Sequence, residues 1–242
     1  MPTRQLLVAD LGVMPYADAL ALQRAAAQAR LSGAIADDIL LLVEHPPVVT
    51  LGRSAKAANL LGSPDLLAAR GVEVFDVERG GDITFHGPGQ LVAYPIVDLT
   101  QHRQDLHWYL RRLEEVIIHA LSPFGISGSR NPGKTGVWVG ERKIASIGVH
   151  ARQWVTWHGF ALNVTTDLSF FDLMIPCGIA DVVMTSVERE LLDAAAGACL
   201  APSPTLFDDV RAHAVTAFSA LFDLSPELVD VPSLLASAAS PR

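Results

Sequence analysis

The stretch GVWVGERKIASIGVHARQWVTWHGFALNV, residues 136–164, decides the fold of this chain. Its pattern predicts three strands, Gly136–Val139, Lys143–Ala151 and Trp154–Val164, separated by only two or three residues. Parallel strands need a crossover of a dozen or more residues, so joins this short resemble hairpins. The stretch therefore predicts a mixed α/β domain rather than a series of strict βαβ units.

The flanking sequence adds helices and further strands. The clearest helix covers residues 106–121, where apolar residues recur at helical spacing. Two more helices are predicted over Tyr16–Leu31 and Leu206–Leu221. Further strands are predicted at Ile39–Glu44, Val48–Leu51, Val72–Val77, Asp82–Phe85 and Leu91–Val97. The short join between the first two of these, through His45-Pro-Pro47, is interpreted as a hairpin.

Composition indicates one soluble domain. The chain has 242 residues, half of them apolar, which is enough for one sizeable core. We expect a single domain over residues 1–232, followed by an Ala/Ser-rich tail, 233–242, that is disordered. No apolar run reaches the length of a membrane span, and the N-terminus lacks the apolar core of a signal peptide. Two cysteines in unlike settings suggest no disulfide framework, so we expect a cytoplasmic protein.

One predicted strand carries a lysine on an apolar face. Alternation along this strand puts Lys143 on one face with Ala145, Ile147 and Val149, and puts Ile144, Ser146 and Gly148 on the other. Burial removes the hydration of an ammonium group and favours the neutral amine, which can accept a proton. Lys143 is therefore a candidate base, unless it only starts the strand at the surface.

A cysteine further along the chain, Cys177, lies between Pro176 and Gly178. The proline fixes the preceding turn, and the glycine lets another group approach the backbone closely. The amides of Gly178 and Ile179 are candidate donors to an oxyanion if secondary structure leaves them free. Cys177 is thus a candidate nucleophile, although a lone cysteine can also be a small buried hydrophobe. Cys199, in an Ala-rich stretch, is interpreted as that second kind.

Two glycine-rich turns flank the short predicted strand Asp82–Phe85. Arg79-Gly-Gly81 precedes it and His86-Gly-Pro-Gly89 follows it, and both expose backbone with little side chain in the way. Small residues elsewhere leave room for an unbranched hydrocarbon chain, and apolar neighbours can form its wall. The small residues are Ser146, Gly148, Gly159 and Ala161, and the apolar ones are Ile144, Ile147, Phe160 and Leu162.

Taken together, these features resemble the octanoyltransferases of lipoate biosynthesis, also called lipoyl(octanoyl) transferases or lipoate-protein ligase B. The most specific element is RGGDITFHGPGQLVAYPIVD, residues 79–98. It is supported in order by EHPP (44–47), GVWV (136–139), RKIASIG (142–148), HGFALN (158–163) and PCG (176–178). The resemblance covers nearly the whole chain. It implies the biotin/lipoate protein ligase catalytic fold, in which mixed sheets pack with helices.

The resemblance also implies roles for individual residues. Cys177 would be the acyl-accepting nucleophile, and Lys143 would adjust its reactivity and act as base. The implied substrate-binding residues are Arg79, Gly80, Gly81, Asp82, Ile83, Thr84, Phe85, His86, Ser146, Ile147, Gly148, Gly159, Phe160 and Ala161.

The implied reaction moves an octanoyl group from octanoyl-acyl carrier protein to a lysine of a lipoyl domain. The acceptors would be 2-oxoacid dehydrogenase subunits and the glycine cleavage H protein. The acyl group would pass through a thioester on Cys177, so neither ATP nor any other cofactor is expected. The sequence holds no HExxH, CxxC or Walker A motif, which gives a metal or nucleotide site no support.

Charge is distributed unevenly. Residues 79–152 carry nine Lys and Arg against six Asp and Glu, whereas the whole chain has a net charge of −8. Carrier proteins and lipoyl domains are acidic as families, so this segment is the expected docking surface. Nucleic acid and membrane partners are not expected. The candidate docking residues are Arg103, Arg111, Arg112, Arg130, Lys134, Arg142 and Arg152.

Four alternatives stay open on sequence alone. A papain-like hydrolase would pair Cys177 with His86 or His158, which both lie in glycine-flanked segments. An ATP-dependent lipoate or biotin ligase of the same fold would need no cysteine. A non-catalytic module would bind the acyl chain without turnover. An amidotransferase would move octanoyl groups between two lipoyl domains.

Overall fold

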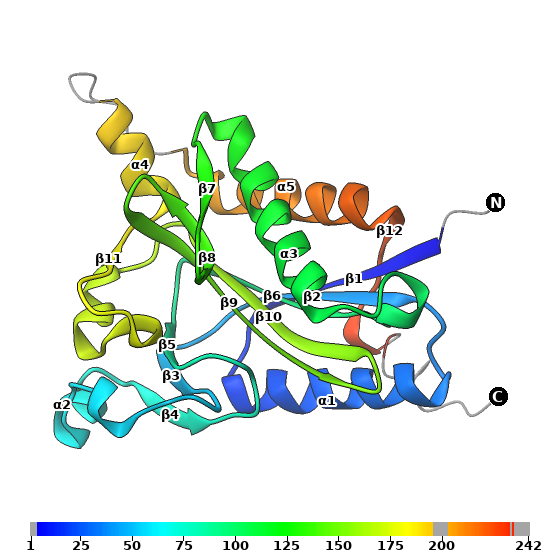
Figure 1. The fold of residues 1–242 in the computed structure, drawn as a ribbon, viewed down its shortest axis with the longest axis horizontal. Coiled ribbons are helices and arrows are strands. Elements are labelled where there is room, and N and C mark those ends of the chain that lie inside the picture. The colour runs from blue at the N-terminus through cyan, green and yellow to red at the C-terminus, as the bar shows by residue number, and fades with distance from the viewer. Residues whose placement is uncertain (1–3, 196–202, 233, 235–242) are drawn as a thin grey trace.

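The computed structural model describes residues 4–195, 203–232 and 234. Within these residues the chain forms one large sheet, one small sheet and five α-helices (Figure 1). The helices are α1 (Tyr16–Ser32), α2 (Pro64–Ala69), α3 (Leu106–Leu121), α4 (Val187–Ala194) and α5 (Leu206–Phe222).

The large sheet is mixed, with strand order β12-β1-β2-β6-β10-β9-β8-β7 and β11 paired beside β9. Its strands are β1 (Arg4–Val13), β2 (Asp38–Glu44), β6 (Gln90–Ile96), β7 (Gly128–Asn131), β8 (Lys134–Val139), β9 (Arg142–Arg152), β10 (Val155–Asn163), β11 (Val183–Met184) and β12 (Leu224–Leu228). Strands β8, β9 and β10 are consecutive antiparallel neighbours, as the stretch 136–164 predicts. Strands β1, β2 and β12 pair in parallel, which makes the sheet mixed.

The small sheet has the order β4-β3-β5, formed by β4 (Glu73–Asp76), β3 (Val48–Leu51) and β5 (Ile83–His86). The predicted hairpin between β2 and β3 is therefore wrong. Strand β2 is already paired on both edges, with β1 and β6, so it has no free edge for β3. The chain through His45-Pro-Pro47 instead carries β3 into the second sheet.

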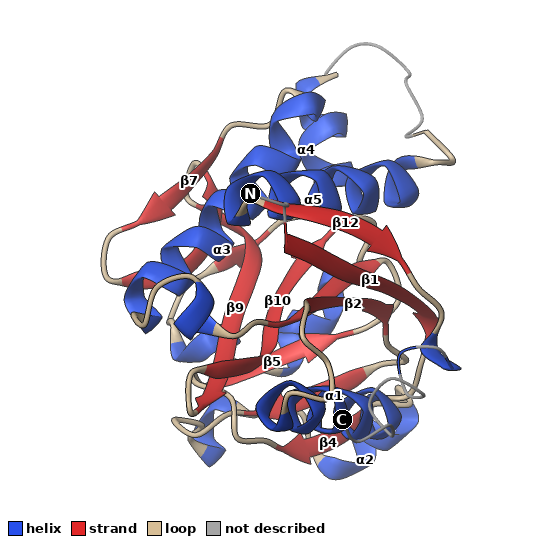
Figure 2. Cartoon of the chain, turned by 90° about the vertical axis from the view of Figure 1, so that its right-hand side faces the viewer, coloured by secondary structure: helices blue, strands red, loops and turns tan. Residues whose placement is uncertain are grey.

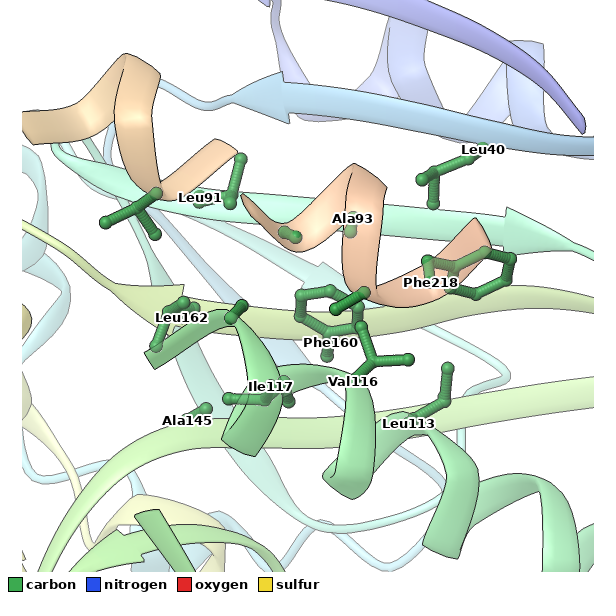
Figure 3. Packing of buried hydrophobic residues seen from close by; sticks show 14 of the residues in the cluster. Leu40, Leu91, Ala93, Leu113, Val116, Ile117, Ala145, Phe160, Leu162 and Phe218 are labelled. Atoms are coloured by element: carbon green, nitrogen blue, oxygen red, sulfur yellow. The ribbon is translucent and has the colours of Figure 1, made fainter. Parts of the chain in front are cut away.

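Helices cover both faces of the large sheet. Helix α1 packs on one face, and α3 and α5 lie together on the other (Figures 1 and 2). Figure 3 shows the core between the large sheet and helices α3 and α5, with Val116 and Ile117 of α3 beside Phe160 and Leu162 of β10. Helix α3 has the predicted bounds, because its apolar stripe faces this core and Asp105 caps its first turn.

The sequence pattern did not predict β1, α2, β7, β11, α4 and β12. The predicted tail, 233–242, lies outside the described residues except Leu234, which is buried in the core under α1. Cys199 also lies outside them. Among the described residues, no helix combines the length and apolar character that a membrane crossing needs.

Candidate active site

Cys177 lies in a single helical turn, Pro176–Gly178, which follows β10 and precedes β11 along the chain. Its backbone is left-handed, with φ 57° and ψ 18°, a conformation that costs free energy for a residue with a side chain. The next residue, Gly178, is also left-handed, and a Cβ there would meet the Asp82 carboxylate at 2.5 Å. The glycine therefore allows the turn to approach the loop before β5 closely, as the sequence predicts.

The Cys177 sulfur has two polar side-chain neighbours. Lys143 Nζ donates to it at 3.1 Å, and Ser146 Oγ lies 3.6 Å away. Both neighbours come from β9, so one strand holds both groups against the thiol. Lys143 is only 1% exposed, which rules out a lysine that merely starts the strand at the surface.

The contact depends on a bulge in β9. Strict alternation would place Lys143 and Ser146 on opposite faces, yet both meet the same sulfur. The pairing register between β8 and β9 shifts at this point, from Val137 opposite Ala145 to Trp138 opposite Lys143. Such a bulge re-aims one side chain relative to its neighbours. The predicted grouping of Lys143 with Ala145 is therefore wrong, although Ala145, Ile147 and Val149 do pack against the α3 and α5 core.

The lysine side chain is enclosed by β8. A Cβ at Gly136 would lie 2.8 Å from Lys143 Cε, and Gly136 has φ 133°, a conformation suited to glycine. The ammonium lies 5.1 Å from the centre of the Trp138 ring, within cation–π range. These contacts leave Lys143 little freedom except to point at Cys177.

The environment of Cys177 favours the thiolate. Burial alone raises the pKa of the Cys177 thiol, but the positive charge of Lys143 opposes it. Hydrogen bonds from Lys143 and Ser146 and the charge of Arg79 act in the same direction as that charge. The net result is a pKa below the ordinary thiol value, which increases the fraction of the nucleophilic form at neutral pH.

The expected oxyanion donors are not available. The amide of Gly178 donates to the Ile175 carbonyl at 3.0 Å, and that of Ile179 donates to the Pro176 carbonyl at 3.1 Å. Both amides are used inside the turn itself, so this sequence-based expectation is wrong. The donors that do lie beside the sulfur are the side chains of Lys143 and Ser146.

A cavity of about 250 Å³ opens from Cys177 between the two sheets. Of the substrate-binding residues implied by the resemblance, it is lined by Arg79, Gly81, Asp82, Thr84, His86, Ser146, Ile147, Gly148, Gly159, Phe160 and Ala161. Sequence reasoning did not include the remaining lining residues in the substrate site: Tyr16, Val92, Tyr94, Gly133, Lys134, Thr135, His158 and Ile179. Tyr16 and Tyr94 come from α1 and β6, and no local motif ties a helix residue to this cavity.

Three of the implied residues do not line the cavity. Ile83 and Phe85 point the other way, into the apolar cluster under the small sheet. Gly80 holds the wall together, because its amide donates to the Val149 carbonyl at 2.8 Å. Alternation along β5 explains the split, since it leaves Thr84 and His86 on the cavity side.

Arg79 is buried in the cavity wall. Its guanidinium donates to the Thr50 carbonyl at 2.7 Å and to the Thr50 hydroxyl at 2.9 Å. Burial lowers the pKa of Arg79 from its ordinary value, and the charge of Cys177 is the largest influence opposing this. Within the described ranges no carboxylate lies at ion-pair distance from it, so its charge acts on the thiol.

Neither candidate histidine pairs with Cys177. His86 Nδ1 donates to Gln90 Oε1 at 2.8 Å, and Gln90 in turn donates to Asn163. Asn163 donates to the Thr185 carbonyl, and the Thr185 amide donates to the Lys143 carbonyl. His86 therefore belongs to a network that anchors the lysine strand. The geometry does not fit a papain-like Cys-His pair.

Most of the predicted docking arginines are occupied by ion pairs. Arg111 and Arg130 bind the buried Glu114, Arg142 binds Glu190, and Arg103 binds Asp105. Arg112 lies over the Trp108 ring. Lys134 is the predicted docking residue that lines the cavity. In the described part of the chain, no group of three or more His, Cys, Asp or Glu side chains is arranged to hold a metal ion.

Comparison with known proteins decides the family. The model of the lipoyl protein ligase A/B catalytic domain matches residues 15–202. An octanoyltransferase from Nostoc sp. is 44% identical over 229 residues, which cover 95% of this chain and 96% of the relative. The chain belongs to the octanoyltransferases. An octanoyltransferase from Rubrobacter xylanophilus is 55% identical over 182 residues, covering 74% of this chain and 81% of the relative.

Solved structures confirm the fold of this octanoyltransferase. Lipoate-protein ligase A bound with ATP superimposes with a TM-score of 0.68 at 16% identity, covering 98% of this chain and 92% of the other. The bipartite lipoate protein ligase of Thermoplasma acidophilum gives 0.66 at 20% identity, covering 97% and 91%. The predicted mixed α/β architecture and its likeness to the lipoate ligase fold are therefore confirmed.

Proposed function

We propose that this octanoyltransferase works through a thioester on Cys177, with Lys143 as its acid and base. The observation that carries the proposal is the 3.1 Å contact between Lys143 Nζ and the Cys177 sulfur at the end of the cavity. The donor is octanoyl-acyl carrier protein. The acceptor is a lysine on a lipoyl domain of a 2-oxoacid dehydrogenase subunit or on the glycine cleavage H protein.

In the first step the Cys177 thiolate attacks the thioester carbonyl of the donor. The new carbon–sulfur bond forms at Cys177, and the bond to the carrier thiol breaks. The Lys143 ammonium gives its proton to the departing thiolate, which leaves a neutral amine beside the acyl-enzyme. One thioester replaces another, so the step is close to balanced and needs no ATP.

In the second step the acceptor lysine, as a neutral amine, attacks the acyl-enzyme. Lys143 takes the proton released from the attacking nitrogen, and the Cys177 thiolate departs. The product is an amide, which is more stable than a thioester, so the step is downhill. Lys143 and Cys177 return to their starting charges, and no cofactor or metal takes part.

Docking of an acidic donor or acceptor is assigned to the cations around the cavity mouth. Lys134 lines the cavity, and Arg53 and Lys56 are exposed on the loop beside Asp82. These charges complement an acidic partner. The reaction is placed in the cytoplasm, where a free thiol stays reduced. Residues 1–232 are assigned to one catalytic domain.

The test is intact-protein mass spectrometry after brief mixing with octanoyl-acyl carrier protein, without ATP. Wild type should gain the mass of one octanoyl group, and Cys177→Ala should gain none. Cys199→Ala removes the other cysteine and is the matched control, so it should be acylated like wild type. Adding a lipoyl domain should remove the adduct.

Two results would contradict the covalent route. The first is an adduct that persists in Cys177→Ala. The second is transfer that proceeds at the wild-type rate in Cys177→Ala when free octanoate and ATP are supplied, as an adenylating ligase would do.

A further inference from the structure

The part of the cavity lined by Tyr16, Tyr94 and His158, called the deep end below, lies at a defined distance from Cys177. Ser146, which contacts the sulfur, pairs with Ala161 on β10, and His158 lies three residues earlier on that strand. At about 3.3 Å per residue, His158 is roughly 10 Å along the strand from that end. An extended octanoyl chain, with C–C bonds of about 1.5 Å at tetrahedral angles, is roughly 9 Å long. Its last carbon therefore reaches the deep end.

This deep end is polar, which is unexpected for a hydrocarbon site. Its lining includes Tyr16, Tyr94 and His158. The His158 ring lies 6.5 Å from Tyr94, and His86 stacks on Tyr16 at 6.1 Å. Burying polar groups against hydrocarbon costs free energy unless they find partners. The composition of the deep end therefore points to a partner other than a methyl group.

His158 adopts a strained backbone to reach this position. Its φ is 57°, which is rare for a residue with a side chain in the middle of a strand. Phe160, two residues on, packs into the core under α3 and α5, so alternation would send His158 there as well. Instead its ring faces Tyr94 on the α1 side, and its amide donates to Gln23 Oε1 at 3.0 Å. Strain of this kind is typical of functional sites.

Two buried nitrogens here lack hydrogen-bond partners. Within the described ranges, His158 Nε2 and Gln23 Nε2 have none, although His158 is only 1% exposed and Gln23 is fully buried. The carboxylate oxygen of Glu78 is 3.9 Å from His158 Nε2, beyond hydrogen-bond distance. Buried polar atoms are rarely left unpaired, so these two nitrogens and the Glu78 carboxylate form polar packing behind the deep end of the cavity.

Tyr94 offers an acceptor beside this nitrogen. His45 Nδ1 lies 2.8 Å from the Met14 carbonyl, which can only accept, so Nδ1 carries the proton. Burial lowers the pKa of His45 to about 4, so the ring is neutral and its Nε2 is a bare acceptor. The Tyr94 hydroxyl, 2.8 Å from that Nε2, must therefore donate to it. The Gln23 side chain also approaches the Tyr94 hydroxyl, which leaves one lone pair of its oxygen to accept a hydrogen bond from a ligand.

The deep end suits an uncharged group. Burial raises the pKa of Tyr16 to about 12 and raises that of Tyr94 well above its ordinary value, so both phenols are neutral. Burial also lowers the pKa of His158, which favours the neutral ring. The Glu78 carboxylate stands behind His158 and would repel an anion.

We propose that the deep end recognises an uncharged hydrogen-bonding group, such as a hydroxyl, at the ω end of the acyl chain. The site then accepts 8-hydroxyoctanoyl groups in addition to octanoyl groups. An octanoyl chain ends before the polar atoms, whereas a ninth carbon would press a methyl group against them. The proposal rests on the acyl-transfer function above.

The sharpest test compares two donors of equal length. Nonanoyl and 8-hydroxyoctanoyl thioesters of N-acetylcysteamine differ only in a terminal methyl or hydroxyl group. Acylation of wild type, followed by intact mass, should favour the hydroxyl donor by about tenfold, the order expected for one buried hydrogen bond. In Tyr94→Phe the ratio of acylation by the hydroxyl donor to acylation by the nonanoyl donor should fall to about one or below it.

Tyr109→Phe is the matched control. It also removes a buried tyrosine hydroxyl, but that hydroxyl accepts from Thr156 outside the cavity at 3.2 Å. Its preference should equal that of wild type. If Tyr94→Phe fails to fold, as judged by thermal melting, His158→Asn replaces it, because asparagine tolerates the left-handed backbone.

A binding measurement separates this proposal from the proposed function. Calorimetry with nonanoic and 8-hydroxyoctanoic acids on Cys177→Ala should give about a tenfold tighter Kd for the hydroxy acid. Failure of wild type to accept any octanoyl group would overturn the transfer function. The Kd values of the two acids would still test whether the deep end binds a hydroxyl group. A wild-type preference for the nonanoyl compounds, or one that Tyr94→Phe leaves unchanged, would overturn the polar site.

Discussion

The two ends of the cavity use opposite electrostatics. At the Cys177 end, Lys143 and Arg79 put positive charge beside a thiol and lower its pKa. At the deep end, burial keeps Tyr94 and His158 uncharged. Both ends nevertheless hold one non-glycine residue at φ 57°, Cys177 and His158. Under the two proposals, charge lies where bonds are made and broken, and neutral hydrogen-bonding groups contact the end of the acyl chain.

Removing the charge at the reactive end should have the largest effect. Lys143→Met keeps an unbranched apolar side chain beside Gly136 and Trp138 but deletes the proton carrier. Single-turnover acylation by octanoyl-acyl carrier protein should slow by about 10²–10⁴-fold, the usual contribution of a general acid or base. The Kd for octanoic acid should stay within about twofold, because the deep end is untouched. A rate near that of wild type would remove Lys143 from the mechanism.

The pH dependence of thiol reactivity sharpens the comparison. In wild type the Lys143 charge lowers the pKa of Cys177 against the opposing effect of burial. Lys143→Met leaves burial in place without the cation, so the pKa of Cys177 should rise. The midpoint of iodoacetamide alkylation against pH should move upward accordingly. Tyr94→Phe is the control and should leave the midpoint where wild type has it; a shift there would mean that the two ends are coupled.

Charge reversal at the cavity mouth should have the smallest effect. Lys134→Glu should lower kcat/KM for octanoyl-acyl carrier protein several-fold at low salt, and the loss should fade as salt rises. Arg152→Glu, at an exposed cation at the end of β9 outside the cavity, is the matched control. Rates with an N-acetylcysteamine thioester should be equal in both variants. Equal losses at Lys134 and Arg152 would argue for a general charge effect instead of docking at the mouth.

Elements with a strong local period could be predicted closely. Helix α3 has the bounds that its apolar repeat indicates, and β3 also matches its prediction. Strand β12 was not predicted because it is an exposed edge strand that contains Pro226, and among the described residues it pairs with β1 alone, at the other end of the chain. The predicted pairing of β2 with β3 is wrong for the same reason, since β1 and β6 occupy both edges of β2.

The candidate site likewise contains residues that the sequence indicated and residues that only the fold brings together. Cys177 and Lys143 stood out from sequence because each occupies an unusual setting for its residue type. The bulge that turns Lys143 toward the sulfur has no signature in the β9 sequence, since it arises from how β8 pairs with it. Tyr16, Tyr94 and His45 gather from α1, β6 and the loop after β2, which only the packed fold brings together.

Local patterns in the sequence indicated the family, the mixed α/β class and the two residues, Cys177 and Lys143, that the structure brings into contact. These are local properties, carried by periodicity and by motifs of contiguous residues. The tertiary structure alone decided the face from which Lys143 meets Cys177, the loss of the Gly178 and Ile179 amides to the turn, and the polar deep end of the cavity. The orientation of Lys143 and the polar deep end depend on free energies of pairing and burial between separate strands and helices, which no local pattern records. The Gly178 and Ile179 amides are taken by hydrogen bonds that form only once the turn has its left-handed backbone.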